Sequence, residues 1–257
     1  MKINIEINPK YQGIVGPLAE ELAANGIPPS AKCIHSARNR LYKLKYAGLN
    51  LNIKAFKVPA FPNSYIYTNF RKSKAFRSFI YATELLKRGL PTPEPVAAIE
   101  VCSNNRLMES YYVSIHSHYA NDLRYWEKRN EKERDDILHA YARLMVAMHR
   151  AGVQHHDLSP GNVMWHRKPG EKTINFHIVD LNRMTLRKRP LKKSEAFSNF
   201  RNINLIEDET RRLGHIYGKE AGIHPAEAEN KAVDALRNDL KRKKFFKTLK
   251  SVFKRRK

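Results

Sequence analysis

The segment His155-His156-Asp157-Leu158-Ser159-Pro160-Gly161-Asn162-Val163 places an asparagine five residues after an aspartate on a turn-rich stretch. On such a loop an aspartate can accept a proton from an attacking hydroxyl, and an asparagine can turn back to bind a magnesium ion on a triphosphate. A second aspartate, Asp180, follows in Ile178-Val179-Asp180-Leu181-Asn182. A phosphoryl group in transfer needs such a carboxylate and its metal for charge neutralisation. These few residues recur by chance, so the elements around them decide whether the pattern is specific.

The first half of the chain predicts a small antiparallel sheet with one helix. Alternating or continuous apolar runs separated by turn residues predict strands over residues 32–35, 41–46, 49–56, 96–101 and 107–115. Lys54 lies inside the third strand. The apolar spacing of residues 73–88 predicts a helix with Ser73 as a possible cap, and Pro91, Pro93 and Pro95 predict an extended connector after it.

The second half predicts a mainly helical domain. Residues 130–150 form a long amphipathic pattern that ends at Gly152, and apolar runs at 163–166 and 174–179 predict a hairpin around Lys168-Pro169-Gly170-Glu171. The change of pattern falls near residues 115–120. We therefore expect an α+β chain with an N-terminal lobe over residues 1–116 and a helical C-terminal lobe over 117–257, with the loop 155–162 in the latter.

Composition narrows the class of partner. The 257 residues are 42% hydrophobic, and 48 Lys and Arg against 25 Asp and Glu give a formal net charge of +23. Such an excess favours phosphate-rich partners, whether nucleotide, nucleic acid or anionic lipid. Two distant cysteines, Cys33 and Cys102, indicate neither a disulfide framework nor a zinc site. Because no signal peptide or membrane span is recognisable, we expect a cytoplasmic protein.

The order of strand lysine, helix, hairpin, long helix, loop and second aspartate is the order of a two-lobed protein-kinase-like fold. Within that superfamily the sequence resembles the bacterial lipopolysaccharide kinase family, which phosphorylates Kdo or heptose sugars of the inner core. The segments that carry the resemblance are Arg38-Asn39, Asn52 to Phe56, Arg71 to Ala75 with Arg77-Ser78, Gly89 to Pro95, His155 to Asn162 and Val179 to Arg183. By this resemblance the chain uses ATP and Mg²⁺, with Asp157 as catalytic base, Asn162 and Asp180 as metal ligands and Lys54 as phosphate anchor.

The sequence departs from kinase patterns at several positions. No G-x-G-x-x-G covers the phosphates, so Arg38 or Asn39 in the turn 36–39 is expected to contact them instead. His156 stands where an arginine is usual, and Asn182 where a glycine is usual. Glu84 is the only carboxylate between Ser73 and Arg88, but it lies nearer the helix end than the register of an ion-pair partner for Lys54 suggests. Two interpretations stay open for Glu84: that partner, or a solvated glutamate.

Basic residues suggest where an anionic acceptor and an anionic surface would bind. Arg183, Arg187, Lys188, Arg189, Lys192 and Lys193 follow Asp180 and are expected to meet an anionic sugar lipid. Residues 240–257 alternate Lys and Arg with Phe245, Phe246, Leu249, Val252 and Phe253, which predicts a basic amphipathic helix on the inner membrane surface. The alternatives are a protein or small-molecule kinase of RIO or aminoglycoside phosphotransferase type, or a nucleic-acid-binding pseudokinase. We do not expect nucleic acid as the partner.

Overall fold

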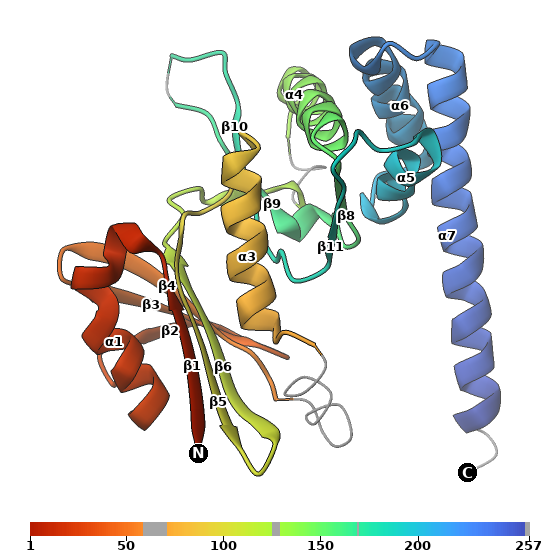
Figure 1. The fold of residues 1–257 in the computed structure, drawn as a ribbon. Coiled ribbons are helices and arrows are strands. Elements are labelled where there is room, and N and C mark those ends of the chain that lie inside the picture. The colour runs from red at the N-terminus through yellow and green to blue at the C-terminus, as the bar shows by residue number, and fades with distance from the viewer. Residues whose placement is uncertain (59–70, 125–128, 169, 255–257) are drawn as a thin grey trace. The chain divides into compact units, whose positions relative to one another are not determined.

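The computed structural model describes residues 1–58, 71–124, 129–168 and 170–254 (Figure 1). The chain divides into two compact units, one formed by Met1–His118 with His177–Asn182 and the other by Tyr119–Phe176 with Arg183–Lys257. The sequence places residues 177–182 in the second lobe, but in the structure this short segment packs with the first unit. The predicted α+β architecture, an antiparallel sheet followed by a helical region, is confirmed.

The first unit is built on a six-stranded antiparallel sheet in the order β1-β5-β6-β4-β3-β2. Its strands are β1 (Lys2–Ile7), β2 (Lys32–Ser36), β3 (Arg40–Tyr46), β4 (Leu49–Ala55), β5 (Pro95–Ser103) and β6 (Arg106–Ile115). Its helices are η1 (Pro9–Tyr11), α1 (Gln12–Asn25) and α3 (Lys74–Lys87). The sheet thus has one strand more than the sequence predicts.

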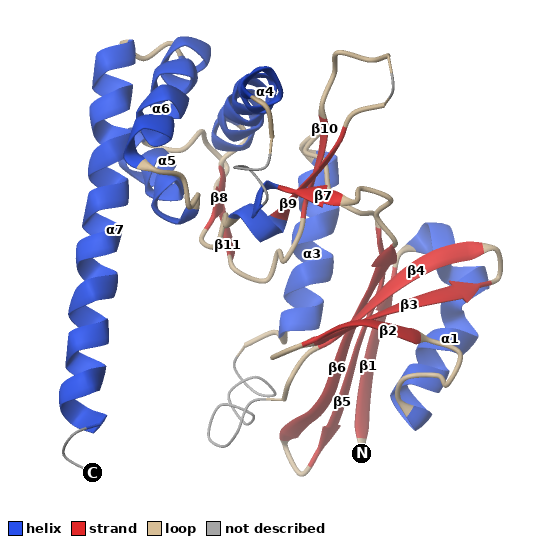
Figure 2. Ribbon diagram, turned by 180° about the vertical axis from the view of Figure 1, so that it is seen from behind, coloured by secondary structure: helices blue, strands red, loops and turns tan. Residues whose placement is uncertain are grey.

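Helices α1 and α3 cover opposite faces of this sheet, as Figures 1 and 2 show from both sides. Successive strand residues point to alternate faces. Leu51 and Ile53 of β4 therefore join Leu18 and Leu22 of α1 in one buried core. Lys54 points to the other face, which is the face that α3 covers.

The N-terminus of α3 is fastened to the sheet by buried hydrogen bonds. The predicted cap is confirmed, since the Ser73 hydroxyl accepts from Phe76 N at 3.3 Å. Ser73 N in turn donates to the buried carboxylate of Glu100 at 3.0 Å, and the Ser110 hydroxyl bonds the Ser73 hydroxyl at 3.3 Å. Glu100 pairs with Ser110 across the strands, and Tyr112 on the same face pairs with Lys54. These contacts show that Lys54 and α3 share one face of the sheet.

The first 25 residues form an element pair that the sequence prediction missed. β1 pairs antiparallel with β5, and α1 packs against the sheet although it contains Gly13, Gly16 and Pro17. Glycine and proline disfavour a helix by intrinsic propensity. Burial of the α1 side chains Val15, Leu18, Ala19, Leu22 and Ala23 outweighs that cost.

The second unit is mainly helical. Its helices are α4 (Glu131–Arg150), η3 (Pro160–Asn162), α5 (Lys193–Phe197), η4 (Ser198–Asn202), α6 (Glu207–Ala221) and α7 (Pro225–Lys254). Its short strands are β7 (Asn121–Asp122), β8 (Val153–His155), β9 (Val163–His166) and β11 (Met184–Leu186), and β10 (Asn175–Ile178) crosses from this unit to the first. β9 pairs with β10 as predicted, and Pro169 of the expected turn lies outside the described residues.

Helices α6 and α7 run side by side in both views of the fold (Figure 2). The predicted helix over residues 240–257 is the end of α7, which begins at Pro225 and is described to Lys254. Within the described ranges, no helix has both the length and the apolar character that crossing a bilayer requires.

Candidate active site

In the first unit, the ammonium group of Lys54 contacts a carboxylate and an aromatic ring. Its Nζ lies 2.6 Å from Asp180 Oδ1, and its side chain is 14% exposed. The same ammonium lies 5.2 Å from the centroid of the buried Phe56 ring. A lysine that is mostly desolvated and held by a carboxylate and a ring face has a fixed position, which binding of a multiply charged anion requires.

Asp180 is held beside Lys54 by the backbone on which it sits. Ile178 N donates to Pro91 O at 2.9 Å, and the Thr92 hydroxyl donates to Ile178 O at 2.8 Å. The proline-rich connector after α3 therefore anchors the segment that carries Asp180. Asp180 itself adopts a left-handed conformation with φ of 58°, which aspartate tolerates better than most residues. Asn182 Nδ2 donates to Asp180 Oδ1 at 2.5 Å, so the unusual asparagine orients the carboxylate.

Glu84 does not pair with Lys54 in the described structure. Its carboxylate lies 3.3 Å from Lys87 Nζ and 3.7 Å from an Arg88 guanidinium nitrogen, both at the end of its own helix. The ion-pair hypothesis for Glu84 is therefore wrong for this structure, and the helix-face interpretation holds. Ser78 does not replace it either, because its hydroxyl donates to Lys74 O within α3 at 2.8 Å. Asp180 is the carboxylate that neutralises Lys54.

Arg38 and Asn39 lie in the turn between β2 and β3. Asn39 Oδ1 accepts from Lys57 N at 3.2 Å, and Asn39 O accepts from Ala37 N at 3.2 Å. The asparagine therefore ties this turn to the chain just after β4. Arg38 is exposed. The structure gives Asn39 a role in shaping the turn, and a phosphate contact by either residue stays a prediction.

In the second unit the loop between β8 and β9 carries Asp157 and Asn162. Asn162 Nδ2 donates to Asp157 O at 2.8 Å, and Asp157 N donates to His155 Nδ1 at 3.1 Å. Because the amide nitrogen of Asn162 is used within the loop, its oxygen is the atom left to bind a ligand. The Asp157 carboxylate is 35% exposed and lies 3.5 Å from Arg183 Nη1.

A buried hydrogen-bond network supports the backbone at the start of this loop. His149 of α4 bonds the Tyr217 hydroxyl at 2.9 Å through Nδ1 and Asn199 Oδ1 at 3.0 Å through Nε2. Asn199 Nδ2 donates to the backbone carbonyl of His155, and Asn202 Nδ2 donates to that of His156 at 3.3 Å. Three helical elements thus support the two residues before Asp157. The sequence prediction missed this network, because its members lie far apart in the chain.

The network predicts a stability loss on acidification. Burial lowers the pKa of His149 to about 4 from 6.5. The unfolded chain therefore takes up a proton near pH 6.5 that the folded chain accepts only near pH 4. The free energy of unfolding should be flat above pH 7 and fall between pH 6.5 and 4, by up to about 1.4 kcal/mol per pH unit from this group. Urea unfolding of wild type and His149→Gln measures it: the variant should lose this part of the slope, whereas the exposed His139→Gln on the same helix should keep it.

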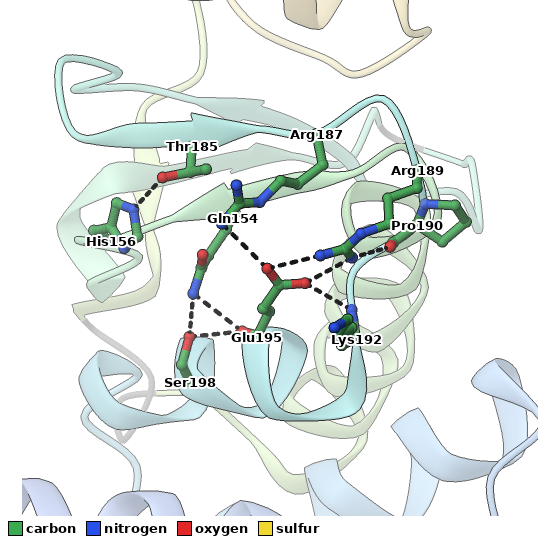
Figure 3. A network of polar contacts seen from close by, with 9 residues as sticks. All are labelled: Gln154, His156, Thr185, Arg187, Arg189, Pro190, Lys192, Glu195 and Ser198. Carbon is green, nitrogen blue, oxygen red and sulfur yellow. Dashed lines mark hydrogen bonds and ion pairs between the residues drawn. The ribbon is translucent and has the colours of Figure 1, made fainter.

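The segment that follows Arg183 is held by a second network, drawn in Figure 3. Glu195 accepts from Arg189 at 2.8 Å and from Lys192 N at 2.8 Å, and it lies 3.2 Å from Arg187. The hydrogen bonds that Glu195 accepts from Arg189 and from Lys192 N lower its pKa to about 2. Gln154 Nε2 donates to Ser198 Oγ at 2.7 Å, which ties β8 to the start of η4. The sequence predicts that Arg187 and Arg189 bind an anionic acceptor. In the structure both side chains bind Glu195.

His156, the residue in place of the usual arginine, is also held in this region. Its Nε2 bonds the Thr185 hydroxyl at 2.7 Å (Figure 3). Burial, with the nearby charge of Arg187, lowers the pKa of His156 below its ordinary value. The imidazole is therefore neutral near pH 7 and contributes a hydrogen bond rather than a charge beside Asp157.

Gly152 allows this segment to approach the end of α4. It has φ of 72°, and a Cβ there would lie 2.5 Å from Arg189 O and 2.6 Å from Arg187 O. Gly152→Ala should therefore lower the free energy of unfolding by about 2–4 kcal/mol, because strain and a backbone clash add. Gly170→Ala is the matched control, since Gly170 has φ of 80° but open space around it. Equal losses in the two variants, measured by urea unfolding, would show that the close approach has no energetic cost.

The structure thus brings the predicted residues together in two sets. Lys54 and Asp180 form an ion pair within the first unit, and Asp157 and Asn162 share a hydrogen bond within the second. Glu84 and Asn39 are used elsewhere. The sequence analysis assigned no role to Asn182, which contacts Asp180, and did not predict the contact of Arg183 with Asp157.

Solved structures define the class of fold to which this arrangement belongs. A structure described as WaaP in complex with acyl carrier protein matches with a TM-score of 0.54 and 20% identity, over 91% of this chain and 99% of that one. An aminoglycoside phosphotransferase structure from Ralstonia eutropha JMP134 matches with a TM-score of 0.51 and 12% identity, over 90% and 88% of the two chains. Both likenesses show a kinase-like fold.

The family model is more specific than these folds. The model of the lipopolysaccharide kinase (Kdo/WaaP) family matches residues 53–210, and the chain belongs to that family. The matched range contains Lys54, Asp157, Asn162 and Asp180. Membership makes the protein an ATP-dependent kinase. No match is found among the curated proteins.

Proposed function

We propose that the protein transfers the γ-phosphoryl group of ATP to a sugar hydroxyl, of Kdo or heptose, on a lipopolysaccharide precursor. The observation that carries this proposal is the Lys54–Asp180 ion pair, which lies within the range matched by the family model. A fixed lysine and carboxylate are what a kinase requires to hold the phosphates of its nucleotide.

Asp157 is the base in this proposal. The acceptor hydroxyl gives its proton to the Asp157 carboxylate while its oxygen forms a bond to the γ-phosphorus. The bond between that phosphorus and the β-phosphate bridging oxygen breaks, and ADP leaves with the electron pair. The backbone contacts of residues 155 and 156 with Asn199 and Asn202 keep the loop in place.

Two residues, one in each unit, carry oxygens of the kind that magnesium prefers. Asp180 offers a carboxylate and Asn162 an amide oxygen, and Mg²⁺ binds through one or two such oxygen ligands together with phosphate oxygens. When bound, the ion neutralises charge on the β- and γ-phosphates. Lys54 adds a positive charge for the phosphates, and Asn182 keeps the Asp180 carboxylate oriented.

An acceptor screen with ATP labelled in the γ-phosphate tests the proposal. Purified protein is incubated with Kdo-lipid A, a heptose-containing core, an aminoglycoside and a generic protein substrate. We expect label on one lipopolysaccharide sugar only. Label on the aminoglycoside or the protein would instead support the rival small-molecule or protein kinase. The likeness to an aminoglycoside phosphotransferase structure is the reason to include the small-molecule rival. Tight, salt-dependent RNA binding without ATP turnover would support the pseudokinase alternative.

We also propose that the end of α7 attaches the protein to the cytoplasmic surface of the inner membrane. From Leu240 to Thr248 every side chain is exposed, including Phe245 at 63% and Phe246 at 52%. The basic residues of this stretch are Lys241, Arg242, Lys243, Lys244 and Lys247. Asp239, buried at the start of the stretch, pairs with two of these, Arg242 and Lys243. The side chains from Leu249 onward lie outside the described residues.

Vesicle sedimentation tests this attachment. Binding to vesicles with anionic lipid should exceed binding to neutral vesicles and should weaken with salt, since each basic side chain contributes about 1 kcal/mol near the surface. Replacing Lys243, Lys244 and Lys247 by glutamine should weaken binding by about 100-fold. The exposed Met108→Ser in the first unit is the control. Equal binding by the triple variant would contradict the proposal.

A further inference from the structure

Arg183 is fixed beside the catalytic loop by its backbone. Its carbonyl accepts from His156 N at 2.9 Å, and the next residue, Met184, pairs with His155 in the β8–β11 ladder. The Arg183 side chain therefore starts from a backbone position that is hydrogen-bonded to His156, the residue just before Asp157. Its Nη1 lies 3.5 Å from Asp157 Oδ2, and its side chain is 57% exposed.

The Arg183 side chain differs from those of Arg187, Arg189 and Lys193. Arg187 and Arg189 are occupied by Glu195, and Lys193 is occupied by Glu227 at 2.8 Å. Arg183 contacts Asp157 only as a long ion pair, and in the described part of the chain its five N–H donors form no hydrogen bond with protein. An exposed pair of this length adds little to stability. The guanidinium is thus available to a ligand that reaches the base.

An acceptor that gives its proton to Asp157 must place its own substituents near this guanidinium. If the acceptor carries a negative charge, that charge approaches an ionised carboxylate, which repels it. A planar guanidinium beside the carboxylate offsets this repulsion and binds a carboxylate or phosphate through two parallel hydrogen bonds. A neutral acceptor brings no such repulsion and forms no such pair of charge-assisted hydrogen bonds with the guanidinium.

We infer that Arg183 binds an anionic substituent, a carboxylate or a phosphate, that lies next to the reacting hydroxyl of the acceptor sugar. The inference rests on the proposed function. It adds that selection of the acceptor depends on the negative charge beside its hydroxyl and not only on its sugar ring. Kdo supplies a carboxylate, whereas a heptose supplies an anion only when it is phosphorylated.

Steady-state kinetics with matched acceptors test Arg183. The carboxylate arm compares a Kdo acceptor with its carboxyl-reduced analogue, and the phosphate arm compares a phosphorylated heptose acceptor with its dephosphorylated form. Wild type should prefer the anionic member of one pair, and that pair identifies the source of the charge. Arg183→Gln should raise KM for that member by about 100-fold and leave its neutral analogue and ATP nearly unchanged.

Two further variants make the result specific. Arg183→Lys should recover part of the loss because it keeps the charge without the planar fork, and the exposed Arg201→Gln should behave as wild type. An equal loss of kcat with both acceptors would show that Arg183 acts only through Asp157 and would overturn the inference, as would unchanged KM. If wild type phosphorylates no sugar acceptor, the proposed function fails and the inference fails with it.

Discussion

Asp157→Asn is expected to lower the rate of phosphoryl transfer by about 10²–10⁴-fold, the usual contribution of a positioned general base. The substitution keeps the size of the side chain but removes its ability to accept the acceptor proton. Asp157 is partly exposed, and its backbone N–H donates to His155, so the loop should keep its conformation. The affinity for ATP should change little. Single-turnover transfer of labelled phosphate and a nucleotide titration measure the two quantities separately.

Asp234→Asn on α7 is the matched control for this substitution, since Asp234 is an exposed carboxylate of the same unit. It should leave both quantities unchanged. Turnover by Asp157→Asn within a few-fold of wild type would remove Asp157 from the role of base. The phosphotransferase chemistry would then require a base that the described loop does not offer.

Asp180→Asn should abolish detectable turnover and also weaken the binding of ATP in the presence of magnesium. The substitution removes the negative charge that we assign to the metal and the partner of Lys54. Lys54, whose side chain is only 14% exposed, then loses the carboxylate that lies 2.6 Å from its Nζ. Loss of one member of a mostly buried pair is costly, because the remaining charge stays desolvated.

Nucleotide titration with and without magnesium distinguishes the two effects of Asp180→Asn. The affinity for ATP should fall about 10-fold or more with magnesium present and much less without it. Lys54→Met should weaken ATP binding under both conditions. An unchanged magnesium dependence in Asp180→Asn would contradict its assignment as a metal ligand, whereas Glu84→Gln should leave binding intact because Glu84 pairs within its own helix.

The chemistry-bearing residues could be predicted because their signal is local. Lys54 lies in an alternating strand, Asp157 and Asn162 share a turn-rich loop, and Asp180 follows a short apolar run. The helix over residues 74–87 was recognisable from its cap and its apolar spacing. The order of these elements predicted the fold, because a kinase-like fold places the strand lysine, the helix, the loop and the second aspartate in this order along the chain.

Other features depend on contacts between distant residues and left no local signal. α1 contains glycine and proline, so only its packing against the sheet explains its helix. The partner of Lys54 depends on a segment 126 positions further along the chain, which the proline connector brings into the first unit. The His149 network joins side chains from three helices. No spacing rule relates such residues, because tertiary packing alone places them together.

We propose that this kinase phosphorylates a sugar of a lipopolysaccharide precursor. Mass spectrometry of lipopolysaccharide from cells that lack the protein, complemented with wild type or with Asp157→Asn, tests it most directly. The account predicts one added phosphate group on one inner-core sugar with wild type and none with the variant. Identical masses in the two samples, with both proteins present at equal levels, would contradict it.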